Sequence, residues 1–466
     1  MSRWATSICK GYRLVPSASR SAVGPAYLFA CLLLGGSAQG IWQNALLQLA
    51  GIGLIGWAAV TPGQERLSRT SRTLLMLAAA TILVVALQAI PLPTAVWAHG
   101  ARASIAHDYL LLGAAPRSLP LSLTPYASIA GLLCLIPPLA LFCTIVRLRA
   151  YRPAWLAGAL LGGTVLGVLL GALQVTSPGR DSPWYLYAQT NHGLGVGFFA
   201  NANHMASLLL LAVPFTAATA VVARSRNIQR YSALLMILAG IAMVLLAGLA
   251  LNGSLAGLSL ALPVIGGSGL LFLRKATAAR VWLAVGVALS MFASLAALAS
   301  SSIGGTRIAQ DASSSVQSRG EIFRTTGHAI ADFMPFGSGL GSFVNVYRLY
   351  ESPDTVTNEY VVHAHNDYAE LALELGVPGI LLMVLFLATW LVAARAVWRR
   401  ESWNPFAQAA SIASAAVLVH SMVDFPLRTA AISASFAMCM ALLAERRTPV
   451  RLDANDLRPT RHLVIG

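Results

Sequence analysis

The residue types best suited to chemistry cluster in one short stretch, residues 362–374, which reads Val-His-Ala-His-Asn-Asp-Tyr-Ala-Glu-Leu-Ala-Leu-Glu. If a helix already runs through this stretch, four of its side chains share one side of it: His363, Asp367, Glu370 and Glu374. His365 then points elsewhere, beside Asn366. Imidazole accepts a proton near neutral pH, and a carboxylate can act as a base or orient one. The stretch therefore predicts acid–base chemistry.

Two assignments of the base stay open. His365 accepts the proton of a reacting hydroxyl, or it only orients that hydroxyl while Glu374 is the base. A zinc site is a further alternative, because His363-x-His365 with nearby carboxylates supplies suitable ligand types. No third ligand follows at a clear spacing, so we expect neither a metal nor another cofactor.

Arginines in the preceding segment could bind phosphate. The planar guanidinium presents a fixed, permanently charged fork to phosphate oxygens. Arg319 and Arg324 are the first candidates, with Arg348 and Arg180 in support. The alternative is that these side chains merely face solvent or lipid headgroups.

The elements that must position these groups are membrane helices. Of the 466 residues, 57% are hydrophobic and 11% charged, against roughly 25% charged in soluble domains. A crossing helix needs about 20 apolar residues. We expect about twelve spans, near residues 24–39, 42–61, 73–90, 124–146, 154–175, 197–222, 231–250, 255–273, 281–300, 371–394, 406–423 and 428–444. A cleaved signal peptide is the alternative for the first.

The charge distribution predicts an orientation. Most of the 32 Lys and Arg residues fall in the termini and in every second loop, which places both termini in the cytoplasm. The formal charge of +15 is thus a topology signal and gives no support to nucleic-acid binding. All nine histidines except His462 lie on or near the opposite, outer face.

The chain is expected to be one membrane domain. We divide it into a cytoplasmic tail (1–23), a membrane domain (24–445) and a second cytoplasmic tail (446–466). Within the membrane domain, the outer loop 301–370 has the amphipathic pattern of short helices that could roof an outward-facing cavity.

Several motifs together resemble the superfamily of O-antigen ligases and O-antigen polymerases (Wzy-like proteins). Any one of them is weak, but their order and their side of the membrane agree. They are His365-Asn366 followed by Gly376-x-x-Gly379, Asn201-Ala-Asn203-His204, Ser318-Arg319, Phe336-Gly-Ser-Gly-Leu-Gly-Ser-Phe343 and Pro-Leu-Pro at 91–93. The resemblance covers roughly residues 70–440.

The resemblance implies an all-α membrane glycosyltransferase of the GT-C-like type, inverting and independent of metal. Its donor would be a glycan on undecaprenyl diphosphate, and its acceptor lipid A–core or a growing glycan. The setting would be the bacterial inner membrane, among membrane lipids, with a periplasmic active site. By this resemblance His365 matches the catalytic histidine and Arg319 an arginine that binds the diphosphate. His363, Asn366, Asn203 and Arg348 would support them.

One position departs from the family pattern. Members often carry arginine in a Ser-Arg-Gly-like motif at the outer start of a span, where this chain has Ser254-Leu255-Ala-Gly257. A polymerase therefore stays open beside a ligase. A secondary transporter or flippase for lipid-linked solutes is the alternative of another class, although charged residues near the middle of the spans, which a transporter would need, are almost absent.

Overall fold

The structure is a computed structural model. It describes residues 18–38, 40–62, 66–179, 181–225, 231–273, 277–299, 307–353, 356, 360–399 and 403–445, with the backbone alone at 231, 277, 295–299 and 307–319. Residues 1–17 of the expected tail 1–23, the whole expected tail 446–466 and Arg180 lie outside these residues.

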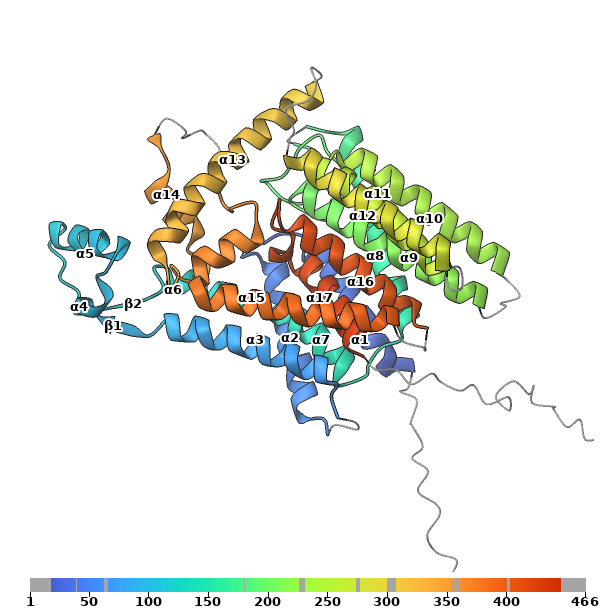
Figure 1. The fold of residues 1–466 in the computed structure, drawn as a ribbon, viewed down its shortest axis with the longest axis horizontal. Coiled ribbons are helices and arrows are strands. Elements are labelled where there is room, and N and C mark those ends of the chain that lie inside the picture. Colours follow the sequence, from blue (N-terminus) through green and yellow to red (C-terminus); the bar gives the residue numbers. More distant parts are fainter. Residues whose placement is uncertain are drawn as a thin grey trace, which may run out of the picture.

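The described chain is an all-α bundle of apolar helices (Figure 1). Eight segments are long and apolar enough to cross a membrane: Trp42–Val60 (α2), Arg69–Gln88 (α3), Pro125–Val146 (α6, Pro125–Cys134, and α7, Ile136–Val146), Pro153–Thr176 (α8), Ala202–Ser225 (α9), Ser232–Asn252 (in α10, Tyr231–Asn252), Leu255–Phe272 (α11, Leu255–Gly269, and η1, Leu270–Phe272) and Asp367–Arg399 (α15). Shorter apolar helices are Ala18–Leu34 (α1), Ala278–Ser294 (in α12, Thr277–Ala299), Pro405–His420 (α16) and Ala430–Ala444 (α17). Every expected span overlaps one of these segments, which confirms an all-α polytopic membrane protein.

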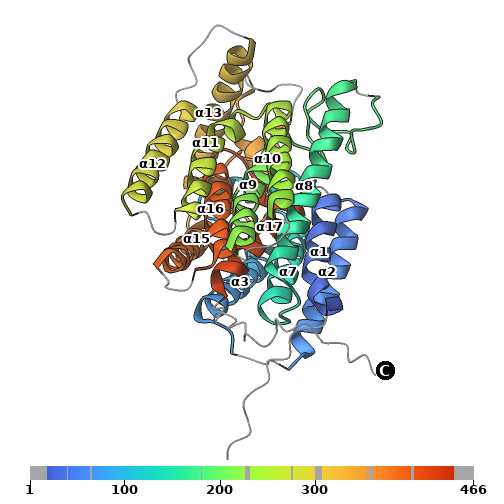
Figure 2. The same cartoon turned by 90° about the vertical axis from the view of Figure 1, so that its right-hand side faces the viewer.

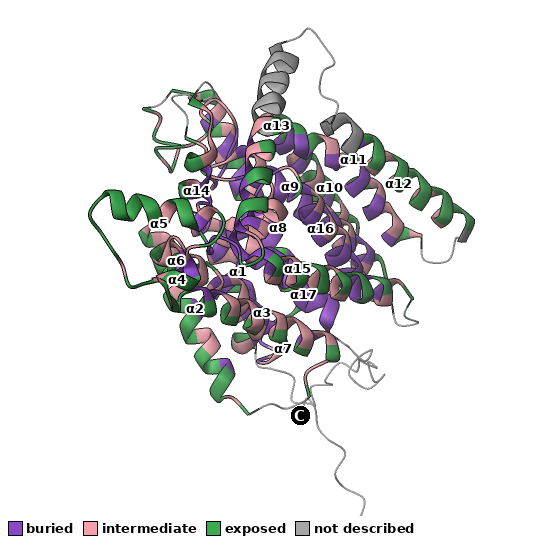
Figure 3. Ribbon diagram, turned by 60° about the vertical axis from the view of Figure 1, so that its left-hand side comes forward, coloured by how far each residue is buried: buried purple, intermediate pink, exposed green. Residues whose placement is uncertain are grey.

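The buried centre of the bundle is α9. It packs against α8, α10, α11 and α16, while α17 packs against α7, α16 and α1. Figure 3 shows buried residues concentrated on these central helices and exposed ones on the periphery. Figure 2 shows α9, α10, α16 and α17 side by side in the middle of the bundle.

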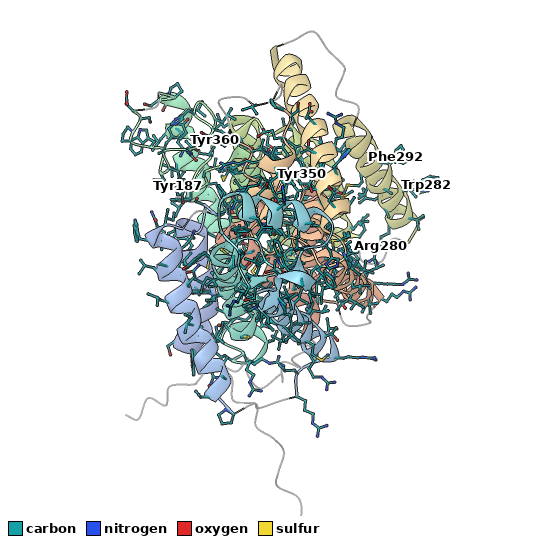
Figure 4. All side chains as sticks on the ribbon, turned by 90° about the vertical axis from the view of Figure 1, so that its left-hand side faces the viewer. Tyr187, Arg280, Trp282, Phe292, Tyr350 and Tyr360 are labelled. Atoms are coloured by element: carbon teal, nitrogen blue, oxygen red, sulfur yellow. The ribbon has the colours of Figure 1, made fainter. Side chains whose placement is uncertain are left out.

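The outermost helices present apolar side chains to their surroundings. On α12, Trp282 is 75% exposed and Phe292 72% exposed, and both point away from the bundle in Figure 4. Large exposed apolar side chains on membrane helices are suited to contact with lipid, because lipid tails are as apolar as the protein interior.

One expected boundary was wrong, because the first helix begins at Ala18, ahead of residue 24. The span expected at 124–146 agrees with the segment Pro125–Val146. Within it the helix is interrupted at Leu135, because Pro137 and Pro138 at the start of α7 lack the N–H groups that a continuous helix uses.

Two segments expected on the outer side form a cap on one end of the bundle, at the left of Figure 1. The segment 91–123 holds a two-stranded antiparallel ladder, β1 (Pro91–Pro93) with β2 (Ser118–Pro120), and the helices α4 (Thr94–Trp97) and α5 (Ala101–Leu111). The loop 301–370 contributes α13 (Arg307–Phe333) and α14 (Phe343–Tyr350). We expected short helices here, but α13 has 27 residues.

Candidate active site

The loop that leads into α15 is fixed by its polar side chains. Oδ1 of Asn366 accepts hydrogen bonds from the backbone N–H groups of Tyr368 (2.9 Å) and Ala369 (3.0 Å), and so caps the helix. Its amide Nδ2 donates to the carbonyl of Met422 at 2.9 Å. The cap starts the helix at Asp367, so the assumption that a helix already includes His363 was wrong. The side chains expected to share a stripe nevertheless meet through the loop.

His365 has an unusual backbone and a buried partner. Its φ of 48° lies in the left-handed region, which few non-glycine residues adopt and which often marks functional sites. Its Nδ1 lies 3.3 Å from Oδ1 of Asp424, and the imidazole donates because a carboxylate only accepts. The His365 side chain is 27% exposed, whereas that of Asp424 is fully buried. The ring is thus held from behind while one edge stays accessible.

Asp424 remains ionised in this setting. Burial alone would raise its pKa, but the hydrogen bond with His365 and the positive charge available on nearby histidines outweigh burial. The pKa of Asp424 is therefore held well below its usual range. Its Oδ1 also accepts from the backbone N–H of Phe425 at 2.9 Å, which fixes the carboxylate in place.

Phe425 joins three histidines. Its ring centroid lies 4.1 Å from that of His363, 5.2 Å from that of His365 and 5.0 Å from that of His204. His204 comes from the start of α9, so this ring contact brings the Asn203-His204 motif to the same site. Asn203 accepts a 2.6 Å hydrogen bond from Ser254, whose hydroxyl in turn caps α11 through the N–H of Gly257.

A second cluster lies beside the first and centres on Arg428, which is 22% exposed. Its guanidinium is 3.5 Å from Asp367, 3.2 Å from Glu370 and 3.4 Å from Glu374. Burial would lower the pKa of Arg428, but Glu370, Glu374 and Asp367 raise it further than burial lowers it. Glu370 also contacts Nδ1 of His363 at 2.9 Å and accepts from the N–H of Ala364.

Glu374 is fully buried and both of its carboxylate oxygens are occupied. Oε2 contacts Arg428, and Oε1 accepts from the backbone N–H of Gly341 at 2.8 Å. This geometry suits a residue that ties α15 to the cap better than a base that must reach a substrate.

The glycine motif of the cap packs directly against a kink in α15. Gly376 has a φ of 62°, and a Cβ there would lie 2.3 Å from the carbonyl oxygen of Pro335. Backbone hydrogen bonds cross this contact, from Ser338 to Leu373 and from Gly339 to Glu374, both at 2.9 Å. The two glycine-bearing motifs noted in the sequence are therefore the two sides of one close backbone contact.

Two polar side chains of other segments reinforce this contact. Gln88 at the end of α3 donates to the carbonyls of Phe336 (2.8 Å) and Glu374 (2.9 Å). Arg102 of α5 is buried and donates to the carbonyls of Leu121 (2.9 Å) and Gly337 (2.6 Å). These hydrogen bonds join the cap, α3 and α15.

The arginines proposed from the sequence do not enter this cluster through any contact in the described part of the chain. Arg324 is 70% exposed and pairs with Glu321 at 2.8 Å. Arg348 is exposed, with its guanidinium 5.3 Å from the ring centre of Tyr360. Arg319 lies on α13, and its side chain is outside the described atoms.

Sequence reasoning missed Asp424, Phe425 and Arg428 as site residues. The available signal was a pair of opposite charges four residues apart, in a short loop between two apolar helices. Charged residues at such a position commonly face protein or water, since exposure to lipid is costly.

These features define a polytopic helical membrane protein with a titratable site at one end of its bundle. Residues 240–384 match the family model described as O-Antigen ligase (Wzy_C), which confirms the resemblance to the O-antigen ligase and Wzy-like superfamily. Over this segment the chain is similar to O-antigen ligases. The matched segment includes His365 and Glu374 and ends before Asp424 and Arg428. No curated protein matches the chain.

Proposed function

We propose that the protein transfers a glycan from undecaprenyl diphosphate to an acceptor hydroxyl in a single inverting displacement. His365 accepts the hydroxyl proton through Nε2, because Nδ1 is turned toward Asp424. The acceptor oxygen forms a bond to the anomeric carbon as the bond from that carbon to the diphosphate oxygen breaks. Undecaprenyl diphosphate leaves with the electron pair of that bond.

The observation that carries this proposal is the pair of His365 with the buried, ionised Asp424, on the segment that matches the O-antigen ligase family. A carboxylate behind an imidazole fixes its tautomer and stabilises the imidazolium that forms as the proton is taken. Such general-base assistance contributes typically about 10²–10⁴-fold. Glu374 acts as a positioning residue, together with His363 and Asn366.

We assign the diphosphate of the donor to Arg319 and Arg324 of α13, with Arg348 of α14 in support. The exposure of Arg324 and Arg348 supports this assignment, because a weak surface ion pair such as Arg324–Glu321 can be exchanged for a phosphate contact. Arg428 is poorly suited to this task because three carboxylates already surround it. Asn203 supports the site through its hydrogen bond with Ser254. The next residue, Leu255, stands where members of the resembled family often carry an arginine.

The acceptor is lipid A–core in a ligase and a growing glycan in a polymerase. In either case we expect the site at the periplasmic face of a bacterial inner membrane, with both termini in the cytoplasm. The positive charge of the expected inner segments supports this orientation.

The test is complementation of a deletion strain with the wild type, His365→Ala or the matched control His328→Ala. His328 is an exposed histidine on α13, outside the described cluster. We expect the wild type and His328→Ala to restore long glycan, and His365→Ala to fail at equal amounts in the membrane. If the deletion strain lacks whole glycan chains on lipid A–core, the protein is a ligase. If the deletion strain carries single unpolymerised repeats instead, the protein is a polymerase. Full complementation by His365→Ala would contradict the proposal and favour a transporter.

A further inference from the structure

A basic cavity lies at the opposite end of the bundle from His365. It has a volume of about 290 Å³ and lies among the loop before α3 and the ends of α7 and α17. The helix α3 begins at this cavity with Arg69 and ends at Gln88, which contacts the site-side loop. Its 20 residues span about 30 Å, the thickness of the hydrocarbon core. The cavity is thus about one bilayer thickness away from the catalytic cluster.

The charges around the cavity are unbalanced. Four arginines line it, Arg66, Arg69, Arg72 and Arg149, against one carboxylate, Glu445. That carboxylate is already engaged, because its Oε2 lies 2.6 Å from Arg149 and accepts from the hydroxyl of Tyr151.

The arginines of the α3 side are left for another partner. In the part of the chain that the structure describes, Arg66, Arg69 and Arg72 form no ion pair with a carboxylate. All three are exposed, and the start of α3 adds the positive end of a helix dipole. Positive charge therefore accumulates around a concave site.

We propose that this cavity binds a phosphoryl group, as carried by the headgroup of an anionic phospholipid. Guanidinium forks match phosphate oxygens, and basic pockets between membrane helices are suited to anionic headgroups. Leu67, Val146 and Ala444 supply an apolar part of the lining that a glycerol backbone can contact. The small volume suits a headgroup better than a drug-sized molecule, whose pockets reach about 1,000 Å³. The site is independent of the transfer reaction.

The test is native mass spectrometry of the purified full-length protein with added phosphatidylglycerol. The variant is Arg69→Gln/Arg72→Gln, and the control is Arg395→Gln/Arg399→Gln, which removes the same charge from exposed positions at the end of α15. Each arginine near a phosphate is expected to change affinity about fivefold. We therefore expect at least a tenfold loss in the variant and less than a twofold loss in the control.

The result also separates the two sources of the phosphoryl group. Displacement of the lipid by millimolar inorganic phosphate would assign the cavity to free phosphate, and retention of the lipid would assign it to a headgroup. Equal losses in the variant and the control would overturn the proposal, because they would show general surface charge and no particular site. Unchanged binding in the variant would overturn it as well.

Discussion

Replacement of Arg428 by glutamine should destabilise the protein strongly, because three carboxylates lose their common partner. At the observed separations of 3.2–3.5 Å, each contact is worth about 5 kcal/mol at an effective dielectric constant of about 20. Most of this attraction offsets the loss of hydration that burial imposes. Removal of one partner from a buried ion cluster typically costs about 3–5 kcal/mol, and we expect Arg428→Gln to lower the free energy of unfolding by that amount.

The assay is unfolding in mixed micelles, followed by tryptophan fluorescence. Arg324→Gln is the matched control, because its ion pair with Glu321 is exposed and such pairs contribute about 0–1 kcal/mol. The double variant Arg428→Gln/Glu374→Gln removes one of the stranded charges and should recover part of the loss. Arg428→Gln with the stability of the wild type, or a double variant less stable than the single one, would refute this account of the cluster.

Three further perturbations test other contacts of the site. Gly376→Ala should lower the free energy of unfolding by at least about 1–3 kcal/mol through the positive φ of this residue alone. The control in the same unfolding assay is Gly53→Ala, which should cost no stability because the space around Gly53 is open. The pKa of Asp424 is lowered in the folded protein. Its ionised carboxylate therefore stabilises the protein at pH values above the ordinary aspartate pKa of about 4, and this stabilisation is lost progressively as the pH falls below about 4. The stability difference between wild type and Asp424→Asn, measured from pH 7 to pH 3, should therefore shrink below pH 4. Phe425→Leu should lower the transfer rate about two- to tenfold, since aromatic contacts of this kind contribute about 0.5–1.5 kcal/mol, and a rate equal to that of the wild type would exclude a positioning role.

The helices could be predicted because their signal is local. Runs of apolar residues give each span, and local features such as the prolines after Leu135 and the side-chain cap of Asn366 set where a helix is interrupted or begins. The glycine motifs could be recognised one by one, but their mutual contact could not. The contact between Gly376 and Pro335 depends on tertiary packing, which the sequence motifs do not encode locally.

The same limit applies to the site. His365 could be singled out because its neighbours in sequence are also polar. Asp424 and Arg428 are separated from it by two apolar helices, α15 and α16, and no periodicity links residues across such a distance. Their pairing becomes visible only when the bundle brings both loops to the same end.

Under the proposed function, the charges of the cluster favour different parts of the site for the base and the donor. Three carboxylates, those of Asp367, Glu370 and Glu374, contact Arg428, and a fourth, that of Asp424, contacts His365. This excess of negative charge repels a diphosphate but stabilises an imidazolium. The donor's diphosphate is therefore better placed toward α13, and the acceptor hydroxyl toward His365. The reacting carbon would lie between them, so that the leaving group departs on the side of positive charge while the proton moves to the side of negative charge.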